Sequence, residues 1–573
     1  MKKIDFGHTI RLTLVVAISF AASACNDMAN VSSAIQWADS CSEASGIVLY
    51  NGMIHTMDAS SSVVSSVRLQ NNLITAVGNQ DEETLGVDGD CRIDLSGRTA
   101  IPGLIDNHSH IIGRGLKPGH MVYAMDSARS WDDAVSLIQK QITVDNIPLP
   151  AEGTVGTQDN FLTVIGAITP GQFSEGALPS FETLNQFDHP IYLESAFTGG
   201  TQTNSAGIDY FRAHGLPVSD DGVVDIGAST NNFAFFNSIA ARQLRSEQTD
   251  DDRVNGVIGV QAWAASLGMT MSLSDGGSEV QRINDSGAIM RVRSLYGGEG
   301  LEELESAIID LNNTPGNEMY RNYAIGEFID GGGVRFPTTV EEVVNEETYI
   351  PKLNLAASLG ATVFQHTLSP LESDGYLRAF EASSEDLTNL RWHLGHVPLL
   401  TTRSMDRLQA LNGGAVAAYF SYSSEEPTAP PPFKALFDHD VHSGLGSDGG
   451  NVAIINPWLG IYHVTTGLDD TGAVVFEELL TVEEAIQMMT VNNAWFSFDE
   501  ENLGSIEEGK LADLAVLSDD VFEMEDLGNL RDVKSVLTIM DGKIVYSDNS
   551  VVTCANANTY GEWFPRSSEE VCE

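Results

Sequence analysis

The stretch that decides the fold reads IPGLIDNHSH and spans residues 101–110. Its apolar first half predicts a buried β-strand, and the polar residues that follow mark the end of that strand. Side chains two positions apart on a strand share a face, so His108 and His110 can point at one metal ion. The pair alone is weak evidence, because a single histidine is more often a buried, hydrogen-bonded side chain.

Seven more apolar runs follow and alternate with helical stretches, which is the pattern of a parallel α/β fold. The eight predicted strands are 101–107, 269–275, 288–295, 322–329, 361–366, 391–396, 415–421 and 442–447. A (β/α)8 barrel requires eight strands, and we expect it to occupy residues 101–503. The interval 111–268 is too long for one crossover, so it is expected to hold an inserted subdomain over the barrel mouth.

Polar residues recur where other predicted strands end. His366, His396 and Asp448 each close an apolar run. Parallel barrels place their active sites at the C-terminal ends of the strands, so these side chains would meet His108 and His110. Each residue taken singly also fits a buried histidine or a helix-capping aspartate. The five together predict a functional site at the barrel mouth.

Short β-type runs separated by turn signals occupy both ends of the chain. Residues 46–100 contain such runs around Asn51-Gly52, and residues 504–550 contain them around Asp541-Gly542. Two separated β segments that bracket a long middle predict one small domain built from both ends.

The composition excludes several classes of protein. The chain has 573 residues, of which 42% are hydrophobic and 19% charged, so it is not a disordered chain, a coiled coil or a collagen-like fibre. Its 80 acidic residues against 30 basic ones give a net charge of −50. Such a surface repels phosphate backbones, so no nucleic-acid partner is expected. Solubility in a salty medium is the favoured explanation of the acidity, and recognition of a cationic partner is the alternative.

The first 24 residues read as a secretory signal peptide. A basic start precedes an apolar run over residues 12–22, which is too short to span a bilayer. Small residues then lead directly into Cys25, as in the lipobox of bacterial lipoproteins. We expect lipidation of Cys25 and attachment to the outer membrane, facing the periplasm or the surface. The alternative is ordinary secretion, with Cys25 as one more thiol.

Residues 25–45 are expected to form a linker and residues 551–573 a C-terminal tail. The remaining cysteines are Cys41, Cys91, Cys554 and Cys572. Four thiols in an oxidising compartment predict disulfides, with three pairings open. A zinc cluster is not expected from them, because no two stand at ligand spacing.

Three motifs together resemble the metal-dependent amidohydrolase superfamily. They are the stretch 102–110, Gly446-Ser447-Asp448 with the following residues 456–461, and the stretch 503–514. The amidohydrolase 3 branch, which includes N-substituted formamide deformylases, is the closer match, and the resemblance runs over residues 46–546. It implies a TIM-type barrel, a composite β-sandwich domain from both termini, and hydrolysis of an amide-type C–N bond by metal-activated water.

Carried over to this chain, the resemblance implies ligand roles for the strand-end residues. His108 and His110 would hold one divalent ion together with Asp448. His366 and His396 would hold a second ion or orient the substrate carbonyl. Asp448 would also accept the proton of the attacking water and pass it to the leaving nitrogen. Zinc is favoured by this ligand set, although such sites also accept iron or manganese.

Strand four departs from the superfamily pattern. Members often bridge two metals with a carboxylated lysine there, but residues 141–351 contain no lysine. Glu327 is the expected substitute, as in members that use glutamate, and Asp330 is the rival. A mononuclear site on His108, His110 and Asp448 is the fallback.

Two further departures concern the substrate. Residues 199–200 are glycines where formamide-deformylase relatives commonly carry a histidine before an Asn-Ser pair, here residues 204–205. His393 replaces the usual arginine three places before His396. Substrate contacts are therefore expected to differ from those of known members of the branch.

Other histidines are expected to lie outside the site. His393 is three residues from His396 and therefore on the opposite strand face, so it is expected to pack outside the barrel. His439 and His442 are expected to form a surface pair in the loop that enters strand eight.

The sequence thus predicts a metal-dependent hydrolase with a small-molecule substrate, touching a membrane only through its lipid anchor. Deamination or cyclic-amide opening is the alternative within enzymes. A surface lipoprotein that keeps the barrel but only binds a ligand is the alternative from another class. The substrate itself and the oligomeric state stay open.

Overall fold

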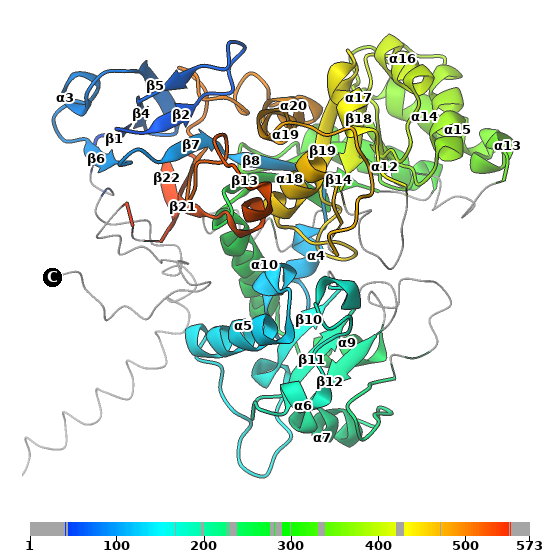
Figure 1. Ribbon diagram of the computed structural model, residues 1–573. Helices are drawn as coiled ribbons and strands as arrows, with labels where there is room; N and C mark the ends of the chain where they lie inside the picture. The colour runs from blue at the N-terminus through cyan, green and yellow to red at the C-terminus, as the bar shows by residue number, and fades with distance from the viewer. Residues whose placement is uncertain are drawn as a thin grey trace, which may run out of the picture.

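The fold is described by a computed structural model (Figure 1). The described residues are 41, 44–166, 168–195, 200–225, 227, 238–275, 280, 289–297, 300–329, 338–419, 429–469, 471–548 and 550–551. The predicted signal peptide, the lipidation site Cys25, the cysteines Cys554 and Cys572, and the rival ligand Asp330 lie outside them. No helix in the described ranges combines the length and apolarity needed to cross a membrane.

Eight parallel strands form the central barrel, in the sheet order β8-β13-β14-β15-β16-β17-β18-β19. They are β8 (Leu104–Ser109), β13 (Met269–Asp275), β14 (Arg291–Tyr296), β15 (Tyr320–Ile325), β16 (Thr362–His366), β17 (His393–His396), β18 (Gly414–Ala418) and β19 (His442–Gly446). The circle closes where Ser109 bridges Gly449, just beyond β19. The predicted (β/α)8 barrel is confirmed, and every strand overlaps its predicted range.

Helices cover the outside of the barrel (Figure 1). They are α4 (Ile111–Gly115), α10 (Asp250–Ala265), α12 (Leu301–Asn313), α13 (Val340–Val343), α14 (Glu346–Ser358), α15 (Pro370–Glu381), α16 (Thr402–Ala410), α17 (Phe433–Asp438), α18 (Pro457–Thr466), α19 (Val482–Met488) and α20 (Val491–Phe496). The side chain of Thr481 caps α19 by accepting a hydrogen bond from the backbone N–H of Glu484. The helix stops before Thr490, whose backbone is not helical and whose hydroxyl donates to the carbonyl of Ile486.

The inserted subdomain joins the barrel through α4 and α10 and stands apart from it in Figure 1. Its sheet has the order β9-β10-β11-β12 and comprises β9 (His120–Met121), β10 (Leu162–Ile165), β11 (Ile191–Glu194) and β12 (Thr201–Thr203). Its helices are η1 (Tyr123–Ser127), α5 (Trp131–Val144), η2 (Gln158–Asn160), η3 (Pro170–Gln172), α6 (Phe181–Leu184), α7 (Ser205–Ala213) and α9 (Ile239–Arg245). Because α4 begins directly after His110, the subdomain lies on the side of the barrel at which β8 ends.

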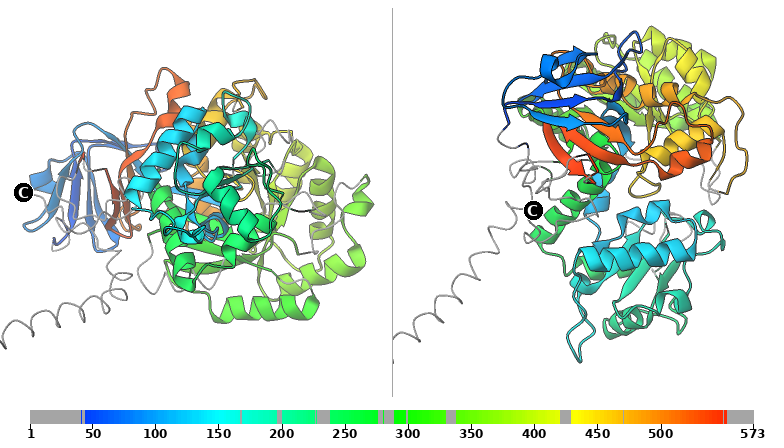
Figure 2. Two further views of the ribbon diagram at one scale, coloured as in Figure 1. Left: turned by 90° about the horizontal axis from the view of Figure 1, so that it is seen from below. Right: turned by 60° about the vertical axis from the view of Figure 1, so that its left-hand side comes forward.

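Two further sheets are built from strands at the ends of the chain, drawn in blue and red in Figure 2; the first is wholly N-terminal and the second combines both ends. One has the order β5-β4-β1-β6, with β1 (Ile47–Tyr50), β4 (Ser66–Gln70), β5 (Leu73–Gly78) and β6 (Cys91–Asp94). The other has the order β22-β21-β20-β7-β2-β3, with β2 (Met53–His55), β3 (Val63–Val64), β7 (Thr99–Pro102), β20 (Leu514–Leu517), β21 (Ser535–Met540) and β22 (Lys543–Ser547). Both sheets bury side chains in one shared apolar cluster, in which Leu49 and Val67 of the first sheet meet Leu514 and Ile539 of the second. The short helices α3 (Glu82–Leu85) and η5 (Leu527–Asp532) lie in the connections.

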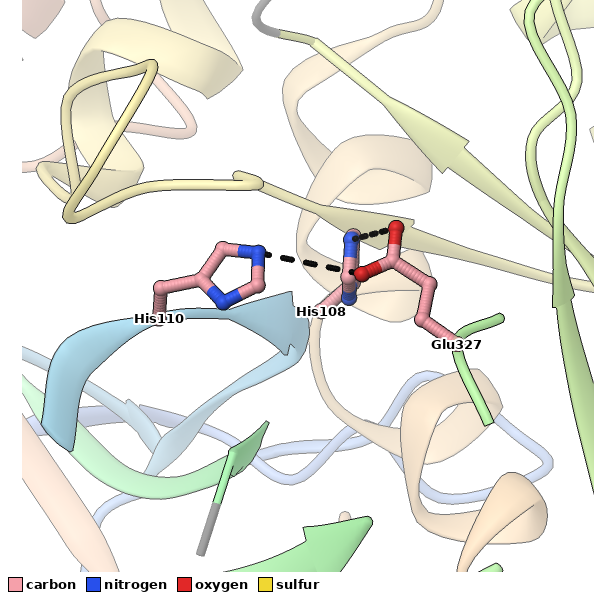
Figure 3. A group of neighbouring side chains, drawn as sticks. All are labelled: His108, His110 and Glu327. Atoms are coloured by element: carbon pink, nitrogen blue, oxygen red, sulfur yellow. Dashed lines mark ion pairs between the residues drawn. The ribbon is translucent and has the colours of Figure 1, made fainter. Parts of the chain in front are cut away.

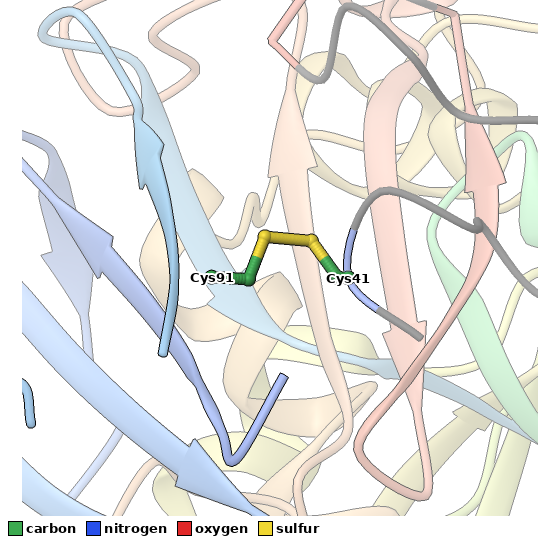
Figure 4. The surroundings of a disulfide bond; sticks show 2 residues. All are labelled: Cys41 and Cys91. Atoms are coloured by element: carbon green, nitrogen blue, oxygen red, sulfur yellow. A yellow bond between two sulfur atoms is a disulfide. The ribbon is translucent and has the colours of Figure 1, made fainter. Parts of the chain in front are cut away.

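A disulfide joins Cys41 to Cys91 at the start of β6 (Figure 4). It is one of the three pairings that the sequence left open. The bond closes a loop of 50 residues and so ties the segment before β1 to the small β domain.

Buried ion pairs fasten the C-terminal part of the chain to the barrel. Arg291 Nε lies 2.8 Å from Asp513 Oδ2, and Arg293 Nε lies 2.8 Å from Asp499 Oδ2. Both arginines are fully buried in β14, and each pair extends to one more charge: Asp541 lies 3.1 Å from Arg291, and Arg321 lies 2.8 Å from Asp499. These pairs belong to the half of the barrel away from the strand ends that carry His108 and His110.

Candidate metal centre

Two imidazoles stand at the end of β8. His108 is buried, and His110 immediately precedes α4. The backbone N–H of His110 donates to the carbonyl of Gly449 at 2.6 Å, and the N–H of Asp448 donates to the carbonyl of His108 at 2.7 Å. The ends of β8 and β19 are therefore joined by backbone hydrogen bonds at the residues that carry the imidazoles and the carboxylate.

Asp448 follows β19 and faces both imidazoles of β8. Its Oδ1 lies 3.3 Å from Nε2 of His108 and 3.0 Å from Nε2 of His110. Its Oδ2 lies 3.7 Å from Nδ1 of His396, the last residue of β17. One carboxylate thus connects the ends of three barrel strands.

Glu327 lies two residues beyond the end of β15, and its carboxylate points toward the β8 histidines (Figure 3). Its Oε1 lies 3.5 Å from Nε2 of His108, 2.6 Å from Nδ1 of His366 and 3.2 Å from Nε2 of His396. Its Oε2 lies 3.9 Å from Nε2 of His110. The structure therefore brings together all six residues singled out as metal ligands. The rival, Asp330, lies outside the described residues.

The donor atoms form three overlapping groups suited to a cation. They are His108, His110 and Glu327; His108, His396 and Asp448; and Glu327, His366 and His396, each with ligand atoms within 4.8 Å of one another. Among the described residues, neither ring nitrogen of the buried His108 makes a hydrogen bond of good geometry, and Nε2 faces only the carboxylate oxygens of Asp448 and Glu327, at 3.3 and 3.5 Å. Such a nitrogen fits a metal-bound imidazole, and imidazole with carboxylate suits zinc. The residues present therefore fit a divalent metal.

The electrostatics of the six residues favour a cation as well. Burial alone would lower the pKa of His108, but the carboxylates of Glu327 and Asp448 raise it to about 9. Burial alone would raise the pKa of Glu327, but His108 and His366 hold it well below its usual range. For His396, burial and the nearby His366 lower the pKa to about 4. Both carboxylates are thus ionised in a buried site, which attracts positive charge.

A third carboxylate, that of Asp106, lies behind the ligands and fixes the backbone beside them. Asp106 is fully buried and accepts hydrogen bonds from the backbone N–H of His108 at 3.1 Å and of Ser447 at 2.9 Å. The Ser447 hydroxyl donates to it at 2.5 Å. Asp106 was not among the residues singled out from the sequence. Its position two residues before His108 is the signal that could have identified it.

His393 lies inside the barrel, which corrects the expectation that it packs outside. It is buried, with its ring 5.1 Å from that of Phe364 and 5.0 Å from that of Phe496. Phe364 in turn packs against His108. The alternation of faces ends at His396, whose backbone has φ +65°. The three-residue offset from His396 therefore predicts the wrong face.

The remaining sequence signals lie apart from the centre. His439 Nε2 lies 3.2 Å from Asp406, and His442 stacks on Trp495. Asn204 caps α7 by accepting from the backbone N–H of Gly207. Phe328 borders the ligands as Phe364 does: it is 46% exposed, with its ring 4.7 Å from that of His366.

Known proteins resemble this chain both in sequence and in fold. The profile described as the Amidohydrolase family matches residues 92–546. The chain is 23% identical to the N-substituted formamide deformylase of Arthrobacter pascens, over 87% of this chain and 98% of that one. A metal-dependent hydrolase from Pyrococcus horikoshii superposes with a TM-score of 0.55 at 17% identity, covering 84% of this chain and 99% of that one. An adenosine deaminase from Xanthomonas campestris with bound zinc gives 0.54 at 13%, covering 91% and 97%.

Proposed function

The chain belongs to the amidohydrolase family, and from this premise we propose that it is a metal-dependent hydrolase that cleaves an amide-type C–N bond. The observation that carries the proposal is the meeting of four histidines and two carboxylates at the C-terminal ends of the barrel strands. Zinc is the proposed metal. Bound between these residues, a divalent ion would supply Lewis acidity, which lowers the pKa of water and polarises a carbonyl.

Asp448 is the proposed general base. Burial alone would raise its pKa, but His396 and His108 hold it below its usual range, so the carboxylate is ionised and able to accept a proton. Its Oδ1 faces the two β8 histidines, beside the place where water would be held. The proton taken from water as its oxygen adds to the amide carbon can then pass to the leaving nitrogen.

The positions of the other residues support a distinct role for each. His108 and His110 would hold one ion together with Asp448, and His366 and His396 would hold a second. Glu327 would join the two sets, because its Oε1 contacts the histidines of both. Phe328 beside His366 would give the substrate an apolar surface.

A turnover panel tests the proposal. Metal-replete protein is assayed with N-substituted formamides, other small amides, cyclic amides and amino-substituted heterocycles, and the release of amine or ammonia is measured. We expect hydrolysis of acyclic amides, its loss on chelation and its return with zinc. Release of ammonia from heterocycles alone would move the assignment to deamination. Binding of panel compounds without any turnover would identify a ligand-binding protein.

A further inference from the structure

The turn that carries Asp448 is compact and closed on itself. It begins at Asp448, just after β19, and ends at Ile455, just before α18. Within it the backbone N–H of Gly450 donates to the carbonyl of Ala453 at 2.8 Å, and Gly450 has φ +115°. Because the turn moves as one unit, a contact at its far end also fixes the end that carries the carboxylate.

The inserted subdomain holds that far end. Asp126, in η1, accepts a hydrogen bond from the backbone N–H of Ile455, with 3.1 Å between Oδ2 and the nitrogen. The subdomain meets the turn at a second place, directly after β10. There the backbone of Gly166 lies so close to the turn that a Cβ at Gly166 would stand 2.5 Å from the carbonyl oxygen of Asn451. The turn 448–455 is therefore packed against two separate segments of the subdomain.

The other oxygen of Asp126 binds the helix that follows the β8 histidines. Its Oδ1 lies 2.6 Å from Nη2 of Arg114 in α4, and both side chains are fully buried. The backbone N–H of Arg114 donates to the carbonyl of His110 at 2.9 Å, so Arg114 stands one helical turn from this candidate ligand. Asp126 thus joins the segment that follows His110 to the segment that carries Asp448.

We propose that Asp126 is a positioning residue for Asp448, so that the docked subdomain completes the metal centre of the barrel. The inference rests on the proposed function, in which Asp448 is both ligand and base. Asp126 acts through the turn: with Ile455 held, Oδ1 of Asp448 stays 3.3 and 3.0 Å from the two β8 imidazoles. Loss of a group that orients a ligand typically costs about 10–100-fold in metal affinity.

Two double variants isolate the hydrogen bond to Ile455. Removal of one charge alone would leave the other uncompensated in the interior, so both variants remove the ion pair. Arg114→Met/Asp126→Asn keeps a side-chain oxygen that can accept from the N–H of Ile455. Arg114→Met/Asp126→Leu has a side chain of similar size and no acceptor. The asparagine variant is therefore the matched control for the leucine variant.

Competition with a chelator measures how tightly each metal-loaded protein holds zinc, and amide turnover is measured at saturating zinc. We expect the leucine variant to hold zinc about tenfold more weakly than the asparagine variant. Its kcat should fall about tenfold while KM changes less than about twofold, because Asp448 acts in the chemical step. Unfolding temperatures show whether each variant is folded.

A glycine pair gives a second test that leaves the ion pair intact. Gly166→Ala presses a methyl group on the carbonyl of Asn451 and should weaken zinc binding about threefold or more, because the turn is displaced. Gly176→Ala is the matched control. Gly176 also lies in the subdomain and has a similar positive φ, but a Cβ there would meet nothing within 4 Å. It should leave the zinc affinity unchanged.

Equal zinc affinities in the two double variants, or in the two glycine variants, would overturn the proposal. A rise in KM at unchanged zinc affinity would overturn it too, since the subdomain would then act on the substrate alone. The affinity comparisons do not require turnover. A wild type that holds zinc but hydrolyses no amide would therefore overturn the proposed function and leave the zinc affinities to decide on Asp126, whereas a wild type that holds no zinc would overturn both.

Discussion

Oε1 of Glu327 lies 2.6 Å from Nδ1 of His366, the last residue of β16. The same oxygen lies 3.5 Å from Nε2 of His108, across the barrel mouth. Two cations held a few Å apart repel strongly, so a binuclear site needs an anion between them. With no lysine between residues 141 and 351, Glu327 is the carboxylate that we propose to supply it, since its Oε1 lies near histidines of both sets.

Replacement of Asp448 by asparagine should slow hydrolysis by at least about 100-fold, because the base is lost while the side-chain volume is kept. The measurement is the turnover of metal-loaded Asp448→Asn on an amide that the wild type hydrolyses. Asp440→Asn, an exposed aspartate before β19, is the matched control and should leave the rate unchanged. Near-normal turnover of Asp448→Asn would remove this residue from the mechanism.

The Ser447 hydroxyl should matter for both stability and metal affinity. Ser447→Ala leaves the buried Asp106 with one donor fewer, which should lower the free energy of unfolding by about 1–3 kcal/mol. Because Asp106 also holds the backbone N–H of His108, metal affinity should fall about tenfold. Denaturant unfolding and metal titration measure the two effects. Full metal affinity in a clearly destabilised variant would show that Asp106 does not position the ligand.

The Arg68–Asp90 pair should make stability depend on pH. Burial alone would raise the pKa of Asp90, but hydrogen bonds from Arg68 and from the backbone of Val87 lower it to about 2. A depressed carboxyl pKa contributes stability above the unfolded value, and that contribution is lost as the pH falls toward the folded value. The difference in unfolding free energy between wild type and Asp90→Asn should therefore shrink between about pH 5 and about pH 2. A difference that stays constant over this range would contradict the assignment.

The Cys41–Cys91 disulfide should stabilise the small β domain. It closes a loop of 50 residues, so the double variant Cys41→Ser/Cys91→Ser should lose about 2–4 kcal/mol of unfolding free energy. Thermal unfolding with and without reductant checks this. Reductant should lower the unfolding temperature of the wild type more than that of the double variant. An equal response of both proteins would exclude the bond as the cause.

The barrel was predictable because eight short strand-like runs alternate with helical stretches, and because β8, β16 and β17 end in polar residues. In parallel sheets this pattern marks the strand and its functional end together. His366 and His396 were found in this way, since each is the last residue of its strand. The insertion was predicted only as an excess of chain length, because its short strands carry little periodic signal.

Other parts of the site depend on backbone geometry that side-chain patterns do not encode. The expectation that residues three apart on a strand lie on opposite faces failed for His393, because the backbone of His396 turns to positive φ. Asp106 sits within the apolar run and contributes through hydrogen bonds to Ser447, which is distant in sequence. Glu327 was predicted because strand four lacks the expected lysine. Only the structure shows that one oxygen of its carboxylate lies near three imidazoles.

The most direct test of the central claim is to count metal ions per chain in the wild type and in Glu327→Ala. Elemental analysis of the purified, metal-loaded proteins gives the number, and amide turnover is measured on the same samples. A bridging role predicts about two ions in the active wild type and one or none in the variant, with no effect of added bicarbonate on metal loading. An unchanged count in Glu327→Ala, or turnover by a wild type free of metal, would contradict it.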